Sequence, residues 1–492
     1  MSRLRSFWLG EADLAPVALF RILYGVQLFN WFWQLYPNLT AFFTDEGIFS
    51  RHQLVALYPE RASLLSLVGE WWQVAVLWAF SCLVAVALAV GWRTRIASLL
   101  AYVLLVSFQW RDPLILDGSD LVFRFMPLWL VFTDAGELYS IDALRRARPA
   151  TGRGRALPVR ILELQVAWIY LATGIEKLSG ALWVDGTAAY YALQLEHTFG
   201  RAWARPIALQ GVLVKLISWS TLAVELGFLP LAMFSSRLTR IIAVVVAAGL
   251  HLGILVLMNV GNFPVIMLSA LVLFLPAARV RAFVVATTRI LRDALPAAVL
   301  RSSERVVAFA AGGLPLPADV VARPSGPHRL AAVALVAFAL FVFSTAVPRA
   351  LEPLRPTGDA ASLVRFLSLD QRWDMFSPDP ARTDGWMVGP AQLTDGTAFD
   401  LYTGGPADDR SERYSDPLYT RWVKVHERIA NAGYGDYRLE YARYFCRVRN
   451  LHLRPGQMPL DTFDLIYMER VVRAPEEGPP LINEYHLWSQ KC

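Results

Sequence analysis

Apolar side chains fall into nine long runs between Leu14 and Arg349, and mostly polar sequence follows to the end of the 492-residue chain. A peptide group inside hydrocarbon finds no water to bond, so an apolar run of about 20 residues crosses a bilayer as a helix. We predict spans near residues 14–36, 71–90, 95–112, 120–135, 159–178, 210–234, 238–258, 262–283 and 329–349. The fold class predicted is an all-α polytopic membrane bundle of about nine transmembrane helices.

The fourth run is the weakest of the nine. It is short and contains Arg124 and Pro127. A charged side chain and a helix-breaking residue are both costly in contact with lipid. We therefore expect this helix to be tilted, kinked or packed away from the bilayer.

The polar C-terminal part has a different pattern. Residues 386–402 and 463–472 alternate in polarity, with Asp395-Gly396 as a hairpin turn, whereas 417–449 has a helical pattern. This predicts a small α+β domain of undefined topology. Cys446 and Cys492 both belong to it, and the sequence leaves open whether they form a disulfide, while Cys82 in the second run is expected to be a buried thiol.

Arginines set the predicted topology. They gather in the segments before the first run and after the second, fourth, sixth and eighth runs, which the positive-inside rule places in the cytoplasm. The N-terminus is then cytoplasmic and the C-terminal domain extracytoplasmic. The predicted domains are a membrane domain (1–285), a cytoplasmic basic amphipathic connector (286–328), a last span (329–349) and the extracytoplasmic domain (350–492).

Composition narrows the class of partner. Hydrophobic residues make up 55% of the chain and charged residues 18%, which fits a multi-pass protein of the cell (inner or plasma) membrane. The net charge of +6 comes from arginines in the short loops, so we expect contact with membrane lipid head groups and not with nucleic acid. Ser179–Arg205 is rich in aromatic residues and predicts interfacial or re-entrant helices on the outer face.

Among the ionisable residues inside the predicted spans, five are candidates for a site: Arg21, Glu163, Lys177, Glu225 and His251. Each is costly in hydrocarbon unless it is paired or functional. One interpretation is structural: Arg21 or Lys177 pairs with Glu163 or Glu225. The other is that some of them form a site.

A group of short motifs resembles the vitamin K-dependent gamma-glutamyl carboxylases and the related bacterial proteins that share the horizontally transferred transmembrane (HTTM) domain. The motifs are Tyr170–Leu178 (YLATGIEKL) with Trp183–Gly186 (WVDG), Arg21–Gly25 (RILYG), Phe132–Ala135 (FTDA) with Ser140–Asp142 (SID), and His251 followed by Gly261–Phe263 (GNF). They spread over most of residues 14–283.

The resemblance implies definite chemistry. In the carboxylases a lysine deprotonates vitamin K hydroquinone, and oxygenation then gives a base strong enough to remove a glutamate γ-proton before carbon dioxide adds. Lys177 matches that lysine, which implies a catalytic role for it, supported by His251 and Glu225, with reduced vitamin K or another quinol as cofactor. A lysine amine at an apolar helix end loses hydration, which favours its neutral, basic form.

The same resemblance names supporting positions and one departure. Arg21, Trp183 and Gly186 belong to the shared motifs, whereas the carboxylases place a functional histidine where this chain has Gly118-Ser119-Asp120. Asp120 is the ionisable residue available there. Asp370–Pro380 resembles a segment that follows the helical body in HTTM proteins and in lipase maturation factors, and we interpret it as a membrane-proximal linker.

Other chemistries lack their motifs. No His-Glu-x-x-His, Walker loop, Gly-x-Ser-x-Gly or Cys-x-x-Cys pattern occurs, and Glu196-His197 alone is a weak basis for a metal site, so no metal is predicted. Three functions stay open: a carboxylase-like membrane enzyme, a maturation or assembly factor that binds a secreted protein or peptide client, and a transporter. The resemblance favours the first through Lys177.

Overall fold

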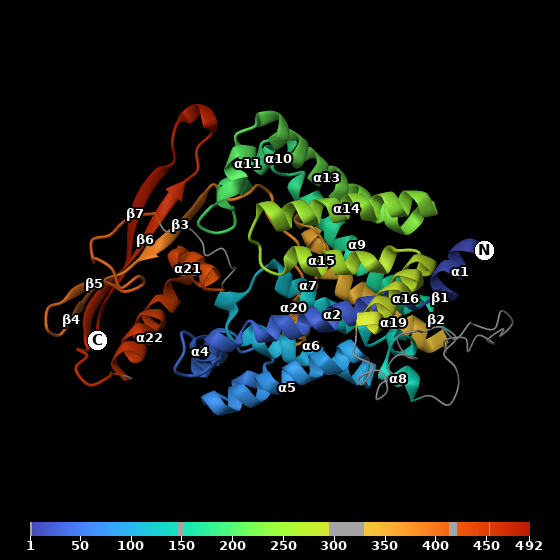
Figure 1. The fold of residues 1–492 in the computed structure, drawn as a ribbon, viewed down its shortest axis with the longest axis horizontal. Coiled ribbons are helices and arrows are strands. Elements are labelled where there is room, and N and C mark those ends of the chain that lie inside the picture. The colour runs from blue at the N-terminus through green and yellow to red at the C-terminus, as the bar shows by residue number, and fades with distance from the viewer. Residues whose placement is uncertain (1, 146–151, 295–328, 413–420, 452) are drawn as a thin grey trace.

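The computed structural model describes residues 2–145, 152–294, 329–412, 421–451 and 453–492. Figure 1 shows a body of packed helices with a β-sheet standing along one side, and the two termini lie at opposite ends of the view. The helices of the body are α1 (Ser2–Leu9), α2 (Ala15–Trp33), α3 (Leu39–Phe43), α4 (Arg51–Leu57), α5 (Trp71–Val90), α6 (Thr94–Arg111), α7 (Gly118–Leu130), α8 (Ile141–Leu144), α9 (Ala156–Lys177), α10 (Ala181–Val184), α11 (Ala188–Gln194), α12 (Arg205–Ala208), α13 (Gly211–Phe234), α14 (Arg237–Leu257), α15 (Phe263–Ala270), α16 (Ala277–Ala294) and α19 (Arg329–Ser344). A two-stranded ribbon pairs β1 (Glu11–Asp13) with β2 (Arg153–Arg155).

Each predicted span contains helical structure, but fewer helices than nine are long and apolar enough to cross a membrane. Among the described residues four qualify, namely α5, α9, α13 and α14, or five if one bent pair counts as a single span. The structure thus supports a helical membrane body without confirming nine transmembrane helices. The basic helix expected over 287–309 is described only as far as Ala294, where α16 ends, and the rest of the 286–328 connector lies outside the described residues.

The predicted span 262–283 is not one straight helix. α15 continues through a 3-10 turn to Phe274, and α16 then leaves at an angle of 118°. The break falls at Pro276, which has no N–H to continue the helical hydrogen bonds. The segment is therefore a broken span or a re-entrant element.

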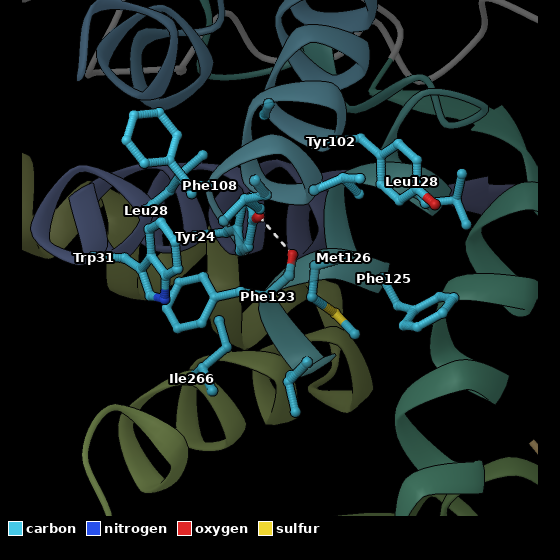
Figure 2. Close-up of a cluster of buried hydrophobic side chains, with 14 of the residues drawn as sticks. Tyr24, Leu28, Trp31, Tyr102, Phe108, Phe123, Phe125, Met126, Leu128 and Ile266 are labelled. Atoms are coloured by element: carbon cyan, nitrogen blue, oxygen red, sulfur yellow. Dashed lines mark hydrogen bonds between the residues drawn. The ribbon is translucent and has the colours of Figure 1, made fainter. Parts of the chain in front are cut away.

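The fourth predicted span forms α7, which lies inside the body. It has 13 residues, nearly all of them buried, and extends about 20 Å at ~1.5 Å per residue, less than the ~30 Å of bilayer hydrocarbon. Figure 2 shows its side chains Phe123 and Met126 among those of α2, α6 and α15. The expectation that this helix packs away from lipid is confirmed.

Pro127 explains one contact in that core. A proline cannot donate to the carbonyl four residues earlier, so the Phe123 carbonyl has no partner within the helix. The buried Tyr24 hydroxyl of α2 donates to it at 2.8 Å, the dashed line of Figure 2. A side chain on one helix thus compensates for a proline on another.

Close contact between α2 and α5 depends on one glycine. A Cβ added at Gly25 would lie 2.5 Å from the backbone nitrogen of Ala89 and 2.6 Å from its Cα. Backbone atoms cannot rotate away as a side chain can. The Gly25 of the Arg21–Gly25 motif therefore sets the distance between these two helices.

The C-terminal part is α+β, as the pattern predicts. Its elements are α20 (Gly358–Phe366), α21 (Trp422–Ala430), α22 (Arg438–Leu451), β3 (Thr383–Val388), β4 (Pro390–Leu393), β5 (Ala398–Asp400), β6 (Leu460–Val471) and β7 (Leu481–Lys491). The long β6 lies in the middle of an antiparallel sheet, with β7 along one edge and β3 and β4 along the other, and β5 extends the sheet beyond β4. The predicted hairpin turn joins β4 to β5 with Gly396 at φ +88°.

Covalent and ionic contacts fix this part in place. Cys446 on α22 and Cys492 after β7 form a disulfide, which settles the open question in favour of bonding, and Cys82 is a free, buried thiol. Arg421 places its guanidinium 2.9 Å and 3.0 Å from the two carboxylate oxygens of Asp120 on α7, and both side chains are buried. The sheet domain is therefore joined to the helical body by buried contacts.

Candidate functional site

A cavity of about 890 Å³ lies where α9, α11, α13 and α14 meet the C-terminal part. Apolar side chains make up most of its wall, among them Ile217 and Val224 on α13 and Leu250, Ile254 and Leu257 on α14. Its size is in the range of small-molecule sites, about 300–1,000 Å³. An apolar molecule of substantial size would fit.

Lys177 and Glu225 both face this cavity and form an ion pair. The Lys177 Nζ lies 2.6 Å from Glu225 Oε1, with Lys177 3% and Glu225 8% exposed. Gly174, one turn before Lys177, brings the helices together, since a Cβ there would lie 3.0 Å from the Cβ of Glu225. The structure thus selects Lys177 with Glu225 from the pairings that the sequence left open, while Glu163 pairs with Arg160 at 2.5 Å.

The pair has unused bonding capacity. Glu225 Oε2 is buried and has no hydrogen-bond partner among the described residues. Lys177 Nζ also lies 4.8 Å from the centre of the Trp183 ring, a distance suited to cation–π attraction. A polar ligand group that enters the cavity would therefore meet an amine, a free carboxylate oxygen and an aromatic face.

The segment 374–381 closes the cavity on the side of α10. Trp183 Nε1 donates to the Phe376 carbonyl at 2.9 Å, and Leu182 N donates to Asp379 Oδ1 at 2.9 Å. A Cβ at Gly180 would lie 1.9 Å from the Pro378 carbonyl oxygen, so glycine is required for this approach. Within the Asp370–Pro380 block, which the sequence suggested to be a membrane-proximal linker, Asp374–Ser377 and Asp379 line the cavity.

His251 lies beside the cavity without lining it. Its Nε2 is 2.6 Å from the hydroxyl of Tyr170, two turns before Lys177 on α9, and its ring is 5.7 Å from that of Phe263. Its Nδ1 is buried and unpartnered among the described residues. His251 could support the site through Tyr170, and the structure shows no direct contact with the ion pair.

The three remaining candidates have other surroundings. Arg21 is buried in the N-terminal half of α2, where it donates to the Tyr139 carbonyl and lies against Gly91. Asp120 accepts from Trp31 Nε1 at 2.7 Å and binds Arg421. Gly186 has φ +77° in the turn after α10, and its N–H donates to the Trp183 carbonyl at 3.2 Å. These positions serve the packing around the site.

Sequence reasoning missed the polar end of the cavity. Asp117 and Ser119 at the start of α7 line it together with Lys424 and Glu427 of α21, two residues linked by a 2.7 Å ion pair. The helical pattern of 417–449 predicted α21, but no local signal places it over the membrane body. The cavity wall therefore combines this polar group with the mainly apolar side chains of α13 and α14.

Near the cavity the segment after α11 is tied to the sheet. The backbone N–H of His197 donates to Asp384 Oδ2 at 2.8 Å, and Arg470 on β6 lies 3.3 Å from Oδ1. Burial raises the pKa of Asp384 although His197 and Arg470 favour its charged form. Glu196 is bonded twice to Arg205 at 2.8 Å, and no group of three or more possible metal ligands occurs in the described part of the chain.

Comparison with known proteins gives relatives that cover part of the chain. Over 201 residues the chain is 28% identical to the uncharacterized protein YitO of Bacillus subtilis (strain 168). The aligned region covers 39% of this chain and 64% of the relative. Over 196 residues it is 26% identical to the sporulation-delaying protein SdpB of the same organism, 38% of this chain and 59% of the relative. The chain thus spans about three-fifths of each relative, and no solved structure matches it.

A model of the HTTM domain matches residues 10–278, which include the Lys177–Glu225 pair and most of the cavity wall. The match covers more than half of the 492 residues. Together with the apolar helices it indicates a membrane protein. The chain belongs to the HTTM domain family.

Proposed function

We propose that this protein is a membrane enzyme in which Lys177 acts as a base toward a lipid-soluble quinol bound in the cavity, with chemistry related to that of the vitamin K-dependent carboxylases. One observation carries the proposal: a buried lysine–glutamate pair faces a cavity whose wall is mainly apolar. A structural ion pair alone would not require an open cavity beside it. Titratable groups in such pockets are frequent sites of function.

The residues of the cavity fit a quinol. The unpartnered Glu225 Oε2 offers an acceptor for a hydroxyl, and the Trp183 and Phe376 rings offer flat apolar surfaces. When bound, a quinol would supply electrons and, after deprotonation, a reaction with oxygen strong enough to drive proton abstraction from a second substrate. The protein would supply the site and the first proton acceptor.

The ion pair is suited to that task. A proton can pass from Lys177 Nζ to Glu225 across their 2.6 Å contact, which leaves a neutral amine beside a neutral carboxylic acid. Burial favours this neutral pair over two separate charges. The free amine can then accept a hydroxyl proton from the ligand, and Glu225 holds the proton that the lysine released.

The arrangement of arginines supports an orientation in which this site lies toward the outer side of the cell membrane. The positive-inside rule puts the C-terminal domain outside, and segment 374–381 and α21 of that domain line the cavity. A second substrate from a secreted protein or peptide would then reach Lys177 from that side. A reporter fused after Cys492 tests the orientation, because activity of a periplasmic reporter supports it and fluorescence of a cytoplasmic one contradicts it.

Oxygen uptake with vitamin K hydroquinone tests the catalytic role. We expect the purified protein to accelerate uptake and Lys177→Met to reduce the rate at least about 100-fold, since removing a general base costs about 10²–10⁴. Lys215→Met, at an exposed lysine of α13 outside the cavity wall, is the matched control. If Lys177→Met misfolds, the double variant Lys177→Met/Glu225→Gln replaces it, because the double variant also removes the carboxylate left without a partner. A rate of oxygen uptake equal to that of the wild type in either folded variant overturns the proposal.

A second candidate, a maturation or assembly factor for a secreted client, rests on the sheet. β7 is an 11-residue edge strand that pairs only with β6 in the described part of the chain, and its Leu481, Ile482 and Tyr485 are exposed. Such an edge can bind an extended peptide by strand addition. Two results together would favour this candidate over the enzyme: Lys177→Met still matures the client fully, and proline at a β7 position whose N–H points away from β6 abolishes maturation.

A further inference from the structure

The cavity reaches the surface of the protein between α13 and α14. Its wall includes Ser220 on α13 and Val246 and Gly249 on α14, and all three residues are exposed, Val246 by 48%. Both helices are long and apolar enough to cross a membrane, and only 22% of the best window of α14 is buried. The opening therefore lies where lipid surrounds the body.

Two glycines keep this side open. Gly249 and Gly253 stand one turn apart on the cavity face of α14, and a Cβ at either would meet no atom within 4 Å. Glycines four residues apart in membrane helices usually allow a second helix to approach closely, and then their Cβ positions are crowded. Here the space in front of them is empty.

A buried polar group lies farther inside. Glu225 is more than nine-tenths buried, lines the same cavity, and keeps Oε2 without a hydrogen-bond partner among the described residues. A wall that is apolar toward lipid and polar toward Glu225 and Lys177 matches an amphiphile whose polar head reaches the pair. Its apolar chain would lie along Gly249 and Gly253.

We propose that the gap between α13 and α14 is a lateral portal through which the ligand enters from the hydrocarbon of the bilayer, with Gly249 and Gly253 forming the channel for one long apolar chain. The inference rests on the proposed function for the identity of the polar head. It adds the route of entry and the requirement for a chain. A head group without a chain would bind without using the portal.

Equilibrium binding to the full-length protein in nanodiscs tests this with two labelled probes, a naphthoquinone with a long prenyl chain and the same naphthoquinone without it. We expect the double variant Gly249→Leu/Gly253→Leu to weaken binding of the prenylated probe at least 10-fold and to change binding of the short probe less than 2-fold. Leucine favours helix more than glycine does, so α14 should stay folded. Gly211→Leu is the matched control, because its Cβ also has open space but the residue does not line the cavity.

The outcomes separate the two proposals. Unchanged binding of the prenylated probe in the folded double variant overturns the portal and leaves the role of Lys177 standing. Equal loss of both probes also overturns it, since the leucines would then block the head-group site. A quinone bound tightly through the portal, together with an unimpaired Lys177→Met enzyme, would support the portal and refute the proposed function.

Discussion

Several buried residues of the body hold backbone groups that local structure leaves without partners. Tyr24 donates to the carbonyl that Pro127 cannot serve, Arg21 donates to Tyr139 O, and Trp183 donates to Phe376 O. A buried polar backbone group without a partner is costly, so each contact stabilises a junction between elements. At this scale the motifs shared with the family are largely devices of packing, whereas Lys177 faces the cavity.

Tyr24→Phe tests the proline compensation. It removes one hydroxyl and leaves the Phe123 carbonyl buried without a donor, which should destabilise the protein by about 1–3 kcal/mol. Thermal unfolding in detergent measures the effect. Tyr36→Phe, at a tyrosine that is 50% exposed, is the control, and equal midpoints for the two variants would contradict the account.

His426 on α21 predicts a pH dependence for the C-terminal domain. Burial among aromatic rings lowers the pKa of its imidazole to about 4, below the ordinary value of about 6.5. Because the pKa of the folded-state imidazole is depressed, the stability of the domain is complete above about pH 6.5 and is lost as the pH falls toward 4. At pH 5 the loss should be about 1–2 kcal/mol.

Hydrogen exchange of the α21 and α22 amides at pH 7 and pH 5 measures this loss. His426→Phe should remove the pH-dependent part, whereas a change at the exposed His52 should not. The same loss of protection in wild type and His426→Phe would show that other groups are responsible.

Helices in this chain follow from the apolar runs, but their role depends on neighbours far away in sequence. The runs predicted α5, α9, α13 and α14 well, since hydrophobicity and length suffice for an isolated span. Pro276 signals the 118° break, but the largely apolar run from Phe263 to Ala278 suggested one helix. The short α7 was correctly expected to avoid lipid because Arg124 and Pro127 are local signals.

Gly25→Ala tests the close contact between α2 and α5. The added Cβ would meet the backbone of Ala89 at 2.5 Å, so we expect destabilisation by about 1–3 kcal/mol despite the better helix propensity of alanine. Gly227→Ala on α13 is the control, because its Cβ would meet only the end of Leu231 at 3.5 Å. A lower midpoint of thermal unfolding for Gly227→Ala than for Gly25→Ala would refute this assignment.

On the scale of the whole molecule, the C-terminal part completes the site. Segment 374–381 and α21 line a cavity whose other walls come from membrane helices. The sequence named Lys177 through a resemblance and left its partner open. It could not reveal that Glu225, Phe376 and Lys424 converge there, because contacts between residues 48 to 247 positions apart leave no local pattern.

Arg421→Leu tests whether the domain depends on its ionic contact with the body. The change leaves Asp120 buried without its cation, which should cost about 3–5 kcal/mol. Adding Asp120→Asn should recover part of that loss. Limited proteolysis between Asp370 and Arg421 reports detachment, and a cleavage rate unchanged by Arg421→Leu would mean that the disulfide-bonded domain is held by other contacts.

The central claim is that the cavity at Lys177 holds a membrane quinol, and the lipid content of the purified protein tests it most directly. Mass spectrometry of the lipids extracted from the wild-type protein should give nearly one quinone per chain. The background to subtract is the quinone content of an unrelated protein purified from the same membrane. Bulk phospholipid alone, with no quinone above that background, would contradict the account.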